Sequence, residues 1–141
     1  MAGDTFQLEV ATPERQLVDE QVSSAEIPAL NGYLGILAGH APLMSKLGAG
    51  VLTYEGGGGP HVLAVAGGFV EVSDNHVRVI ADNAEAAEEI QLDKARRQLE
   101  EANRDLQNAR DEASSDAALR SIQHAQARID AVERGSSGPV H

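Results

Sequence analysis

The chain has 141 residues, no cysteine, 42% hydrophobic and only 3% aromatic residues, and a formal net charge of −11. This length suits one ordinary core or a small core with an appendage, and the lack of cysteine excludes disulfides, thiol catalysis and thiolate metal sites. The negative charge argues against non-specific nucleic-acid binding and against adhesion to anionic lipid, so we expect membrane association only through other proteins.

Alternating apolar residues predict short strands in the first part of the chain. Phe6, Leu8 and Val10 alternate with polar or small residues, and further strand-like runs cover residues 22–28, 43–47, 51–54, 61–66, 69–72 and 76–81. A glycine-rich loop at 55–60 and a turn at 73–75 separate some of these runs. Short strands at intervals of about ten residues predict an antiparallel β-sandwich or a flattened barrel.

Residues 31–42, NGYLGILAGHAP, stand out from this pattern. Glycines alternate with Leu34, Ile36 and Leu37, which predicts a short buried strand between tight turns. His40 follows, and Pro42 prevents helix formation, so we expect a stiff loop that displays one imidazole. From the residue types alone, this loop is a β-corner whose His40 bonds to a neighbouring carbonyl.

The hydrophobic period changes between Asp82 and Glu89. Seven apolar residues then repeat at spacings of three and four on a helix of about 22 residues: Leu92, Ala95, Leu99, Ala102, Leu106, Ala109 and Ala113. Residues 114–116, Ser-Ser-Asp, predict a turn and an N-cap. A second seam then follows, at Ala118, Ile122, Ala125, Ile129 and Val132.

The sequence therefore predicts an α+β protein. We expect a β-sandwich at 1–87, an antiparallel helical hairpin at 88–134, and a flexible tail at 135–141. Residues 1–87 carry 11 acidic and 3 basic side chains, whereas residues 88–141 carry 11 and 8. Because burying Ala stabilises less than burying Leu, a seam that alternates the two predicts a hairpin that can separate from its contacts.

The sequence offers no catalytic motif. The glycine run at 56–59 lacks the Lys-Ser/Thr pair of a phosphate loop, and no Ser lies in a G-x-S-x-G elbow. The five histidines show no short ligand spacing, so we expect no metal site.

The first predicted helix contains a candidate anion site. Asp93, Arg96 and Arg97 lie within one turn and Arg104 lies two turns further on, so the guanidinium groups could converge on a polyphosphate. The alternative is a solvated face, because Asp93–Arg97, Arg96–Glu100, Arg97–Glu101 and Glu100–Arg104 are i, i+4 pairs.

Three segments resemble the ε subunit of bacterial F-type ATP synthase, the counterpart of the mitochondrial δ subunit. They are G-x-L-G-I-x-x-G-H-A-P-L from Gly32 to Leu43, AVAGGFVEVSDNHVRVIAD from Ala64 to Asp82, and LDKAR from Leu92. The resemblance implies a non-catalytic rotor subunit that couples proton translocation through the c ring to ATP synthesis. It also implies a peripheral position on the cytoplasmic face of the bacterial inner membrane.

The same resemblance implies contacts for particular residues. The sandwich would pack on the γ subunit and meet the c ring through Tyr33, Gly39, His40 and Pro42, and Tyr33 stands where many relatives have Glu. No cofactor is required, but the LDKAR segment is similar to a motif that binds regulatory ATP, through Asp93 and Arg96. Arg97 stands where that motif has Ala.

The hairpin would be the inhibitory part of such a subunit. Extended, it would insert among the α and β subunits and block ATP hydrolysis, with basic residues contacting acidic partner surfaces: Arg97, Arg104, Arg110, Arg120 and Arg128. Two alternatives stay open at this point. An unrelated adaptor with a sandwich and a coiled-coil hairpin would share the periodicities, and a small ATP-sensing module would need a pocket.

Overall fold

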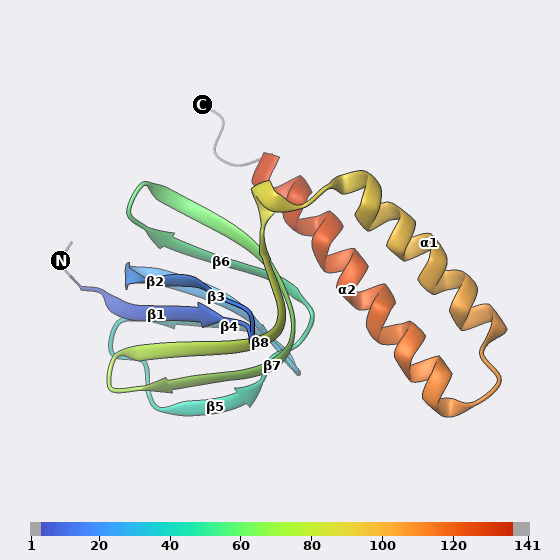
Figure 1. The fold of residues 1–141 in the computed structure, drawn as a ribbon. Helices are drawn as coiled ribbons and strands as arrows, with labels where there is room; N and C mark the ends of the chain where they lie inside the picture. The colour runs from blue at the N-terminus through green and yellow to red at the C-terminus, as the bar shows by residue number, and fades with distance from the viewer. Residues whose placement is uncertain (1–3, 137–141) are drawn as a thin grey trace.

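The computed structural model describes residues 4–136 and consists of a β-sandwich with a helical hairpin against one side (Figure 1). Eight strands come first: β1 (Phe6–Ala11), β2 (Gln16–Val22), β3 (Ser24–Ala29), β4 (Gly32–Leu37), β5 (Leu43–Lys46), β6 (Gly50–Gly56), β7 (Gly59–Ser73) and β8 (His76–Ala86). The short 3-10 helix η1 (Ala87–Glu89) then leads to α1 (Leu92–Asn108) and α2 (Glu112–Ser136). The α+β class and the sandwich are therefore confirmed.

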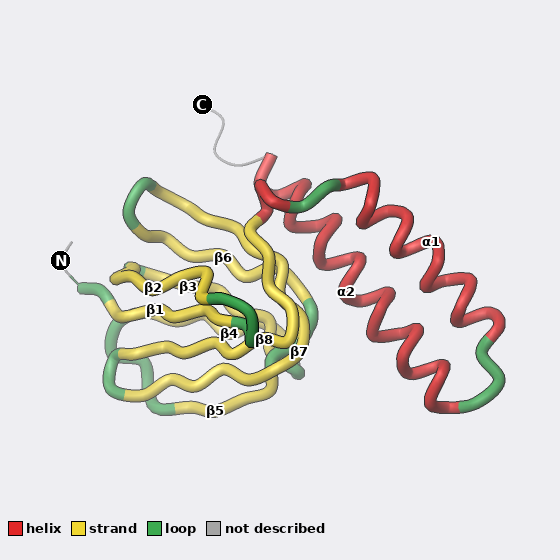
Figure 2. The backbone as a smooth tube through the Cα atoms, in the orientation of Figure 1, coloured by secondary structure: helices red, strands yellow, loops and turns green. Residues whose placement is uncertain are grey.

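The strands form one sheet in the order β2-β1-β8-β7-β6-β3-β4, with β5 paired to β7 outside this path. All pairs are antiparallel except β1 with β8, which is parallel. Figure 2 shows the sheet folded over on itself, with the connecting loops at its two ends. The predicted antiparallel sandwich thus contains one parallel pair.

The long strand β7 bends at Gly67 and Gly68, which makes two layers from one sheet. The register with β8 passes from Ala66↔Asn83 to Gly68↔Ala81, and both glycines have positive φ, of 73° and 115°. A Cβ on Gly68 would lie 1.9 Å from the Ile80 carbonyl oxygen, so only glycine fits there. The two runs predicted at 61–66 and 69–72 are therefore halves of one strand.

The sandwich core contains the predicted inward residues of β1, since Phe6, Leu8 and Val10 are all buried. They pack with buried side chains from the other strands, including Ile27, Ile36, Leu52, Leu63, Val65, Val70, Val72, Val77 and Val79. One strand was missed, because residues 16–22 form β2, which the sequence did not predict as a strand. The strand predicted around Leu34 and Ile36 is present as β4, but its predicted burial was wrong, since β4 is largely exposed except at Ile36.

The hairpin has a shorter first helix than predicted. Helix α1 ends at Asn108, and α2 begins at Glu112, where Asp111 Oδ1 accepts the Ser114 backbone N–H at 2.8 Å. The predicted N-cap at 114–116 was therefore wrong, and Ala113 lies on α2. The seam residues Ala95, Ala102, Ala118, Ala125 and Ile129 are all buried.

Helix α2 continues beyond the predicted end of the hairpin at residue 134. It includes Gly135 and Ser136, so the proposed flexible tail does not begin at 135. The rest of that tail, residues 137–141, lies outside the described residues.

Candidate functional site

The loop that holds Gly39, His40 and Pro42 lies at the end of the sandwich remote from the hairpin, and Asn75 fixes it there. Asn75 is in the β7–β8 turn, where Asp74 and Asn75 have positive φ, as a type I′ turn requires. Its Oδ1 accepts the Gly39 N–H at 2.8 Å, and its Nδ2 donates to the Thr5 carbonyl at 2.7 Å. The sequence predicted this turn but not the side chain's role in positioning the loop.

His40 is bonded locally. Its Nδ1 lies 2.7 Å from the carbonyl oxygen of Ala41, and its backbone N–H donates to Leu37 at 3.1 Å. The predicted bond from His40 to a neighbouring carbonyl is therefore present. The Nδ1 bond orients the ring.

Tyr33 does not share this loop. It is near the start of β4, whereas His40 follows the other end of the strand at Leu37, which lies about 13 Å from Tyr33 at the usual rise per residue. The Tyr33 hydroxyl accepts the Val51 N–H at 3.0 Å, at a point where β3 no longer pairs with β6. The ring is still 50% exposed. The four residues predicted for one contact therefore form two separate sites on the sandwich.

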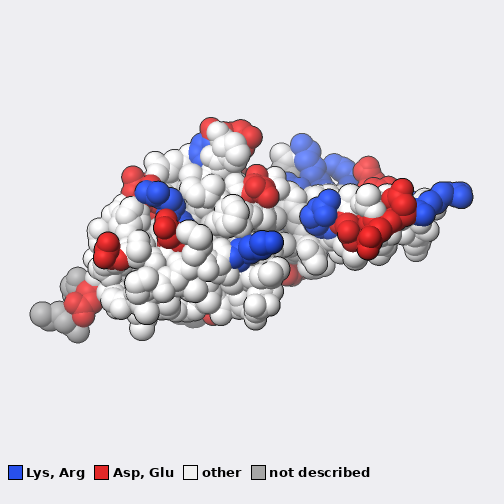
Figure 3. Space-filling view, turned by 90° about the horizontal axis from the view of Figure 1, so that it is seen from below, with Lys and Arg blue, Asp and Glu red and all other residues white. Residues whose placement is uncertain are grey.

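An exposed apolar patch, formed by Met44, Phe69 and Ile80, covers part of β5, β7 and β8. Phe69 and Ile80 face each other across β7 and β8 and are 56% and 45% exposed. Met44 is 67% exposed and lies two residues from Lys46, the β5 partner of Phe69. In the view from below, charged side chains gather on the hairpin and are sparser on the sandwich (Figure 3). Large apolar side chains grouped in this way are typical of a partner-binding surface.

Helix α2 contributes several small side chains to the contact between the hairpin and the sandwich. Helix α2 lies against β6 and β7, with α1 on its outer side (Figure 1). Ala127 and Ala131 are buried there, and a Cβ on Gly135 would lie 3.0 Å from the Ala87 Cβ. This contact cluster also includes Val51, Ala64, Ile90, Ala95 and Ile129, with Val62, Leu92, Leu99 and Val132 packed against it. Because α2 contributes small side chains at Ala127, Ala131 and Gly135, these positions add limited apolar area to the contact.

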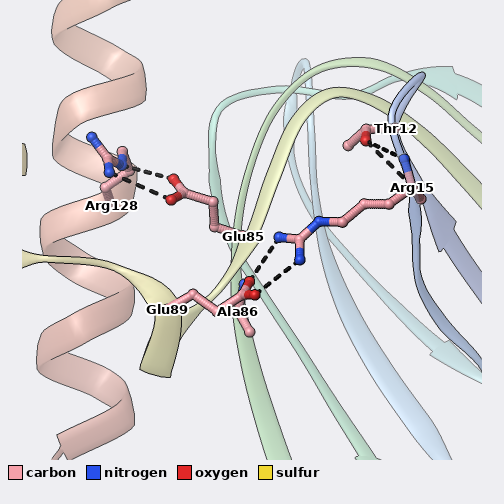
Figure 4. Close-up of polar contacts among 6 residues, drawn as sticks. All are labelled: Thr12, Arg15, Glu85, Ala86, Glu89 and Arg128. Carbon is pink, nitrogen blue, oxygen red and sulfur yellow. Dashed lines mark hydrogen bonds and ion pairs between the residues drawn. The ribbon is translucent and has the colours of Figure 1, made fainter.

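Two ion pairs reinforce this attachment, and Figure 4 shows both. Arg128 on α2 donates through Nε to Glu85 on β8 at 2.8 Å, and its side chain is only 17% exposed. Arg15, before β2, donates to both carboxylate oxygens of Glu89 in η1, at 2.9 and 2.7 Å. The Arg15 hydrogen bond, with a bond from the Ala86 N–H, lowers the pKa of Glu89 to about 2.

The predicted ATP residues Asp93 and Arg96 lie on the exposed side of α1. Arg97 and Arg104 are exposed as well, and in the described part of the chain none of the four predicted i, i+4 pairs comes within 4.0 Å. A shallow groove of about 480 Å³ near the hairpin tip is lined by Asp105, Arg110 and Ser114 among others, and it includes neither Asp93 nor Arg96. Asp93 and Arg96 thus lie on an open helix face, outside this groove.

The other predicted regulatory arginines differ in their surroundings. Arg110 and Arg120 are exposed like Arg97 and Arg104, whereas Arg128 is engaged within the molecule. Among residues 4–136, no three His, Asp or Glu side chains gather closely enough to hold a metal ion. Neither α1 nor α2, as far as they are described, is long and apolar enough to cross a bilayer.

Comparison with known proteins gives one consistent result. Residues 5–87 match the family described as ATP synthase, Delta/Epsilon chain, beta-sandwich domain. The chain is 48% identical over 131 residues to the ATP synthase epsilon chain of Solibacter usitatus, covering 93% of this chain and 98% of that one. It is 41% identical to the ATP synthase epsilon chain of Anaeromyxobacter sp. (strain K), with 90% and 97% covered.

Solved structures agree. A chain in the Euglena gracilis mitochondrial ATP synthase, solved with OSCP, F1 and the c-ring, superposes with a TM-score of 0.78 at 28% identity. That match covers 92% of this chain and 81% of the other. A chain of the Tetrahymena thermophila mitochondrial ATP synthase, from its central stalk and c-ring, has a TM-score of 0.67 at 19% identity, with 89% and 95% covered, and shows the same fold.

Proposed function

Because the chain belongs to the ATP synthase delta/epsilon family and is an accessory, non-catalytic subunit of the central stalk, we propose a role for each of its surfaces. The sandwich joins the γ subunit to the c ring and so couples proton translocation to ATP synthesis. The hairpin restrains ATP hydrolysis by leaving the sandwich and entering the α and β subunits. The complex holds the chain at the cytoplasmic face of the bacterial inner membrane.

The observation that carries this proposal is the apolar patch of Met44, Phe69 and Ile80. We assign it to the γ subunit, because a rotor subunit must transmit torque through a contact that excludes water over a firm β surface. The strands beneath the patch are well supported, since Val70 and Val79, next to Phe69 and Ile80 in sequence, are fully buried.

The c-ring contact is assigned to the two separate sites that hold Tyr33 and the loop 39–42. Tyr33 offers a half-exposed ring at the start of β4, near Leu30, which is 66% exposed. Gly39, His40 and Pro42 offer a loop held by Asn75. Since both sites are fixed by hydrogen bonds, neither has to become ordered on binding.

The inhibitory role of the hairpin is supported by the small side chains, Ala127 and Ala131, that α2 buries in its contact with the sandwich. Release would free Arg128 and present it with Arg97, Arg104, Arg110 and Arg120 to acidic surfaces of the α and β subunits. Regulatory ATP is assigned to Asp93 and Arg96. Calorimetry with Mg-ATP tests that assignment, because heat from micromolar ATP should disappear in Arg96→Ala.

Two measurements test the proposal as a whole. In the first, the double variant Phe69→Ser, Ile80→Ser should fail to co-purify with γ, whereas Leu119→Ser, which removes an exposed Leu from α2, should bind normally. In the second, deletion of residues 88–141 in the assembled complex should raise ATP hydrolysis and leave coupled synthesis in place. Normal γ binding by the double variant would overturn the assignment of the patch to γ, and unchanged hydrolysis would remove the inhibitory role.

A further inference from the structure

Arg128 occupies the junction of three elements and holds them together. Its Nε and Nη2 donate to the Glu85 carboxylate on β8 at 2.8 and 3.4 Å, and its Nη1 donates to Gln98 Oε1 on α1 at 2.9 Å. The Arg128 and Glu85 side chains are 17% and 29% exposed. Removing the hairpin from the sheet breaks the first contact, and separating α1 from α2 breaks the second. The guanidinium of Arg128 therefore opposes both the release of the hairpin from the sheet and the separation of α1 from α2.

Gln98 connects this guanidinium to a histidine. Because the Gln98 carbonyl oxygen accepts from Arg128, its amide nitrogen faces His124 Nδ1, at 3.4 Å. An amide NH₂ only donates, so Nδ1 must accept, which requires a neutral imidazole. Rotating the amide would offer its oxygen to a protonated ring, but it would then turn the NH₂ toward the donors of Arg128. Neither orientation satisfies both a charged His124 and Arg128.

We propose that protonation of His124 opens this cluster, separates α1 from α2 and releases the hairpin from the sandwich, so that acid favours the released form. The inference rests on the proposed role of the hairpin as a releasable inhibitor. The charge of Arg128 on α2 repels a protonated His124, and the charge of Glu85 on β8 attracts it. Helix α1 places the neutral Gln98 beside the ring. The acid response thus belongs to a cluster that joins all three elements.

The direction of the pH effect follows from the surroundings of the ring. Burial, and then the charge of Arg128, lower the pKa of His124, with Glu85 opposing them. When release also separates α1 from α2, the ring loses the packing of both the sheet and α1 and returns to water and to its ordinary pKa of 6.5. The released form therefore binds the proton more tightly, and the packed hairpin loses stability as the pH falls below about 6.5.

The full chain suits a distance measurement because it contains no cysteine. Glu55→Cys on β6 and Asn108→Cys at the end of α1 would carry a donor and an acceptor dye. We expect the equilibrium constant for release to rise several-fold from about pH 8 to about pH 5.5. In His124→Gln this rise should vanish, whereas His61→Gln, which alters a histidine stacked on Tyr54 in the sandwich, should keep it.

A second variant separates this inference from the proposed function. Arg128→Ala should release the hairpin even at about pH 8, where His124 is neutral. Release in Arg128→Ala without any acid response in the unaltered chain would overturn the role of His124 and leave the inhibitor proposal standing. An acid response that persists in His124→Gln would likewise overturn it. A hairpin that stays packed in Arg128→Ala and in acid would count against both.

Discussion

Arg15 and Glu89, separated by 74 residues in sequence, form a two-bonded ion pair that ties the start of β2 to the linker before the hairpin. The contact is 2.7 Å at its shorter bond, and Glu89 also accepts the Ala86 N–H at 3.0 Å. The linker thus begins from a fixed point, and the hairpin is positioned at its base as well as along α2.

We expect Glu89→Gln to loosen the linker and to change the acid stability of the chain. The pKa of Glu89 falls from an ordinary 4.5 to about 2, so its ionised form stabilises the folded chain above about pH 4.5 and that contribution is lost as the pH falls through about 2. Both side chains are nearly half exposed, so the effect should be small and weaken with salt. Unfolding curves against pH, with hydrogen exchange at Ile90, measure it. Glu88→Gln alters the adjacent carboxylate, and an equal effect there would contradict the prediction.

We expect Gly68→Ala to destabilise the sandwich strongly. The residue has a φ of 115°, and a Cβ would meet the Ile80 carbonyl oxygen at 1.9 Å, so the bend of β7 cannot persist unchanged. Strain of this kind costs on the order of 1–3 kcal/mol, and the steric overlap adds to it. Thermal unfolding measures the loss. Gly57→Ala is the matched control, because a Cβ at Gly57 meets nothing within 4 Å, and equal melting temperatures for the two variants would contradict the prediction.

We expect Tyr33→Phe to lower the free energy of unfolding by about 1 kcal/mol while keeping the ring for a partner. The reason is that the Val51 N–H loses its acceptor at a point where β3 offers none. Chemical denaturation measures the change. Tyr54→Phe should have less effect, because the Tyr54 hydroxyl reaches Glu20 only at 3.5 Å. If Tyr33→Phe is as stable as the unaltered chain but weakens assembly with the c ring, the hydroxyl serves the partner instead.

The sequence predicted those parts of the fold in which local pattern and burial agree. The alternation of β1, the β7–β8 turn and the heptad seam all depend on near neighbours, and the structure has each of them. Strand β2 was missed because only Val18 and Val22 are buried in it, and its remaining residues are mostly polar. Gly67 and Gly68 indicated a break, whereas pairing with β8 carries the strand through them.

The site was less predictable because its parts meet only in three dimensions. Ala127 and Ala131, the buried residues of α2 outside the heptad seam, could not be predicted as an interface, because alanine is common on both the buried and the exposed side of a helix. Arg128 is typical of a solvated helix face, and it is buried because Glu85 at the end of β8 and Gln98 on α1 both meet it in the folded chain. The four predicted c-ring residues follow one motif in sequence, but an extended strand separates Tyr33 from the other three.

We expect Ala131→Leu to separate the hairpin from an intact sandwich. Ala131 has no exposed surface, and its neighbours Ala87, Val51 and Ala64 belong to the same packed cluster. Three additional carbons at such a site cost about 1–3 kcal/mol when the surroundings cannot move, but α2 can move as a unit, so the strain should favour release over unfolding. Limited proteolysis should then cut the helices early and leave residues 4–86 protected. Ala117→Leu places the same side chain at an exposed position of α2 and should leave the proteolysis pattern unchanged. If Ala131→Leu instead lowers the melting temperature of the whole chain in one transition, the hairpin and the sandwich unfold together, and the view of a separable hairpin is wrong.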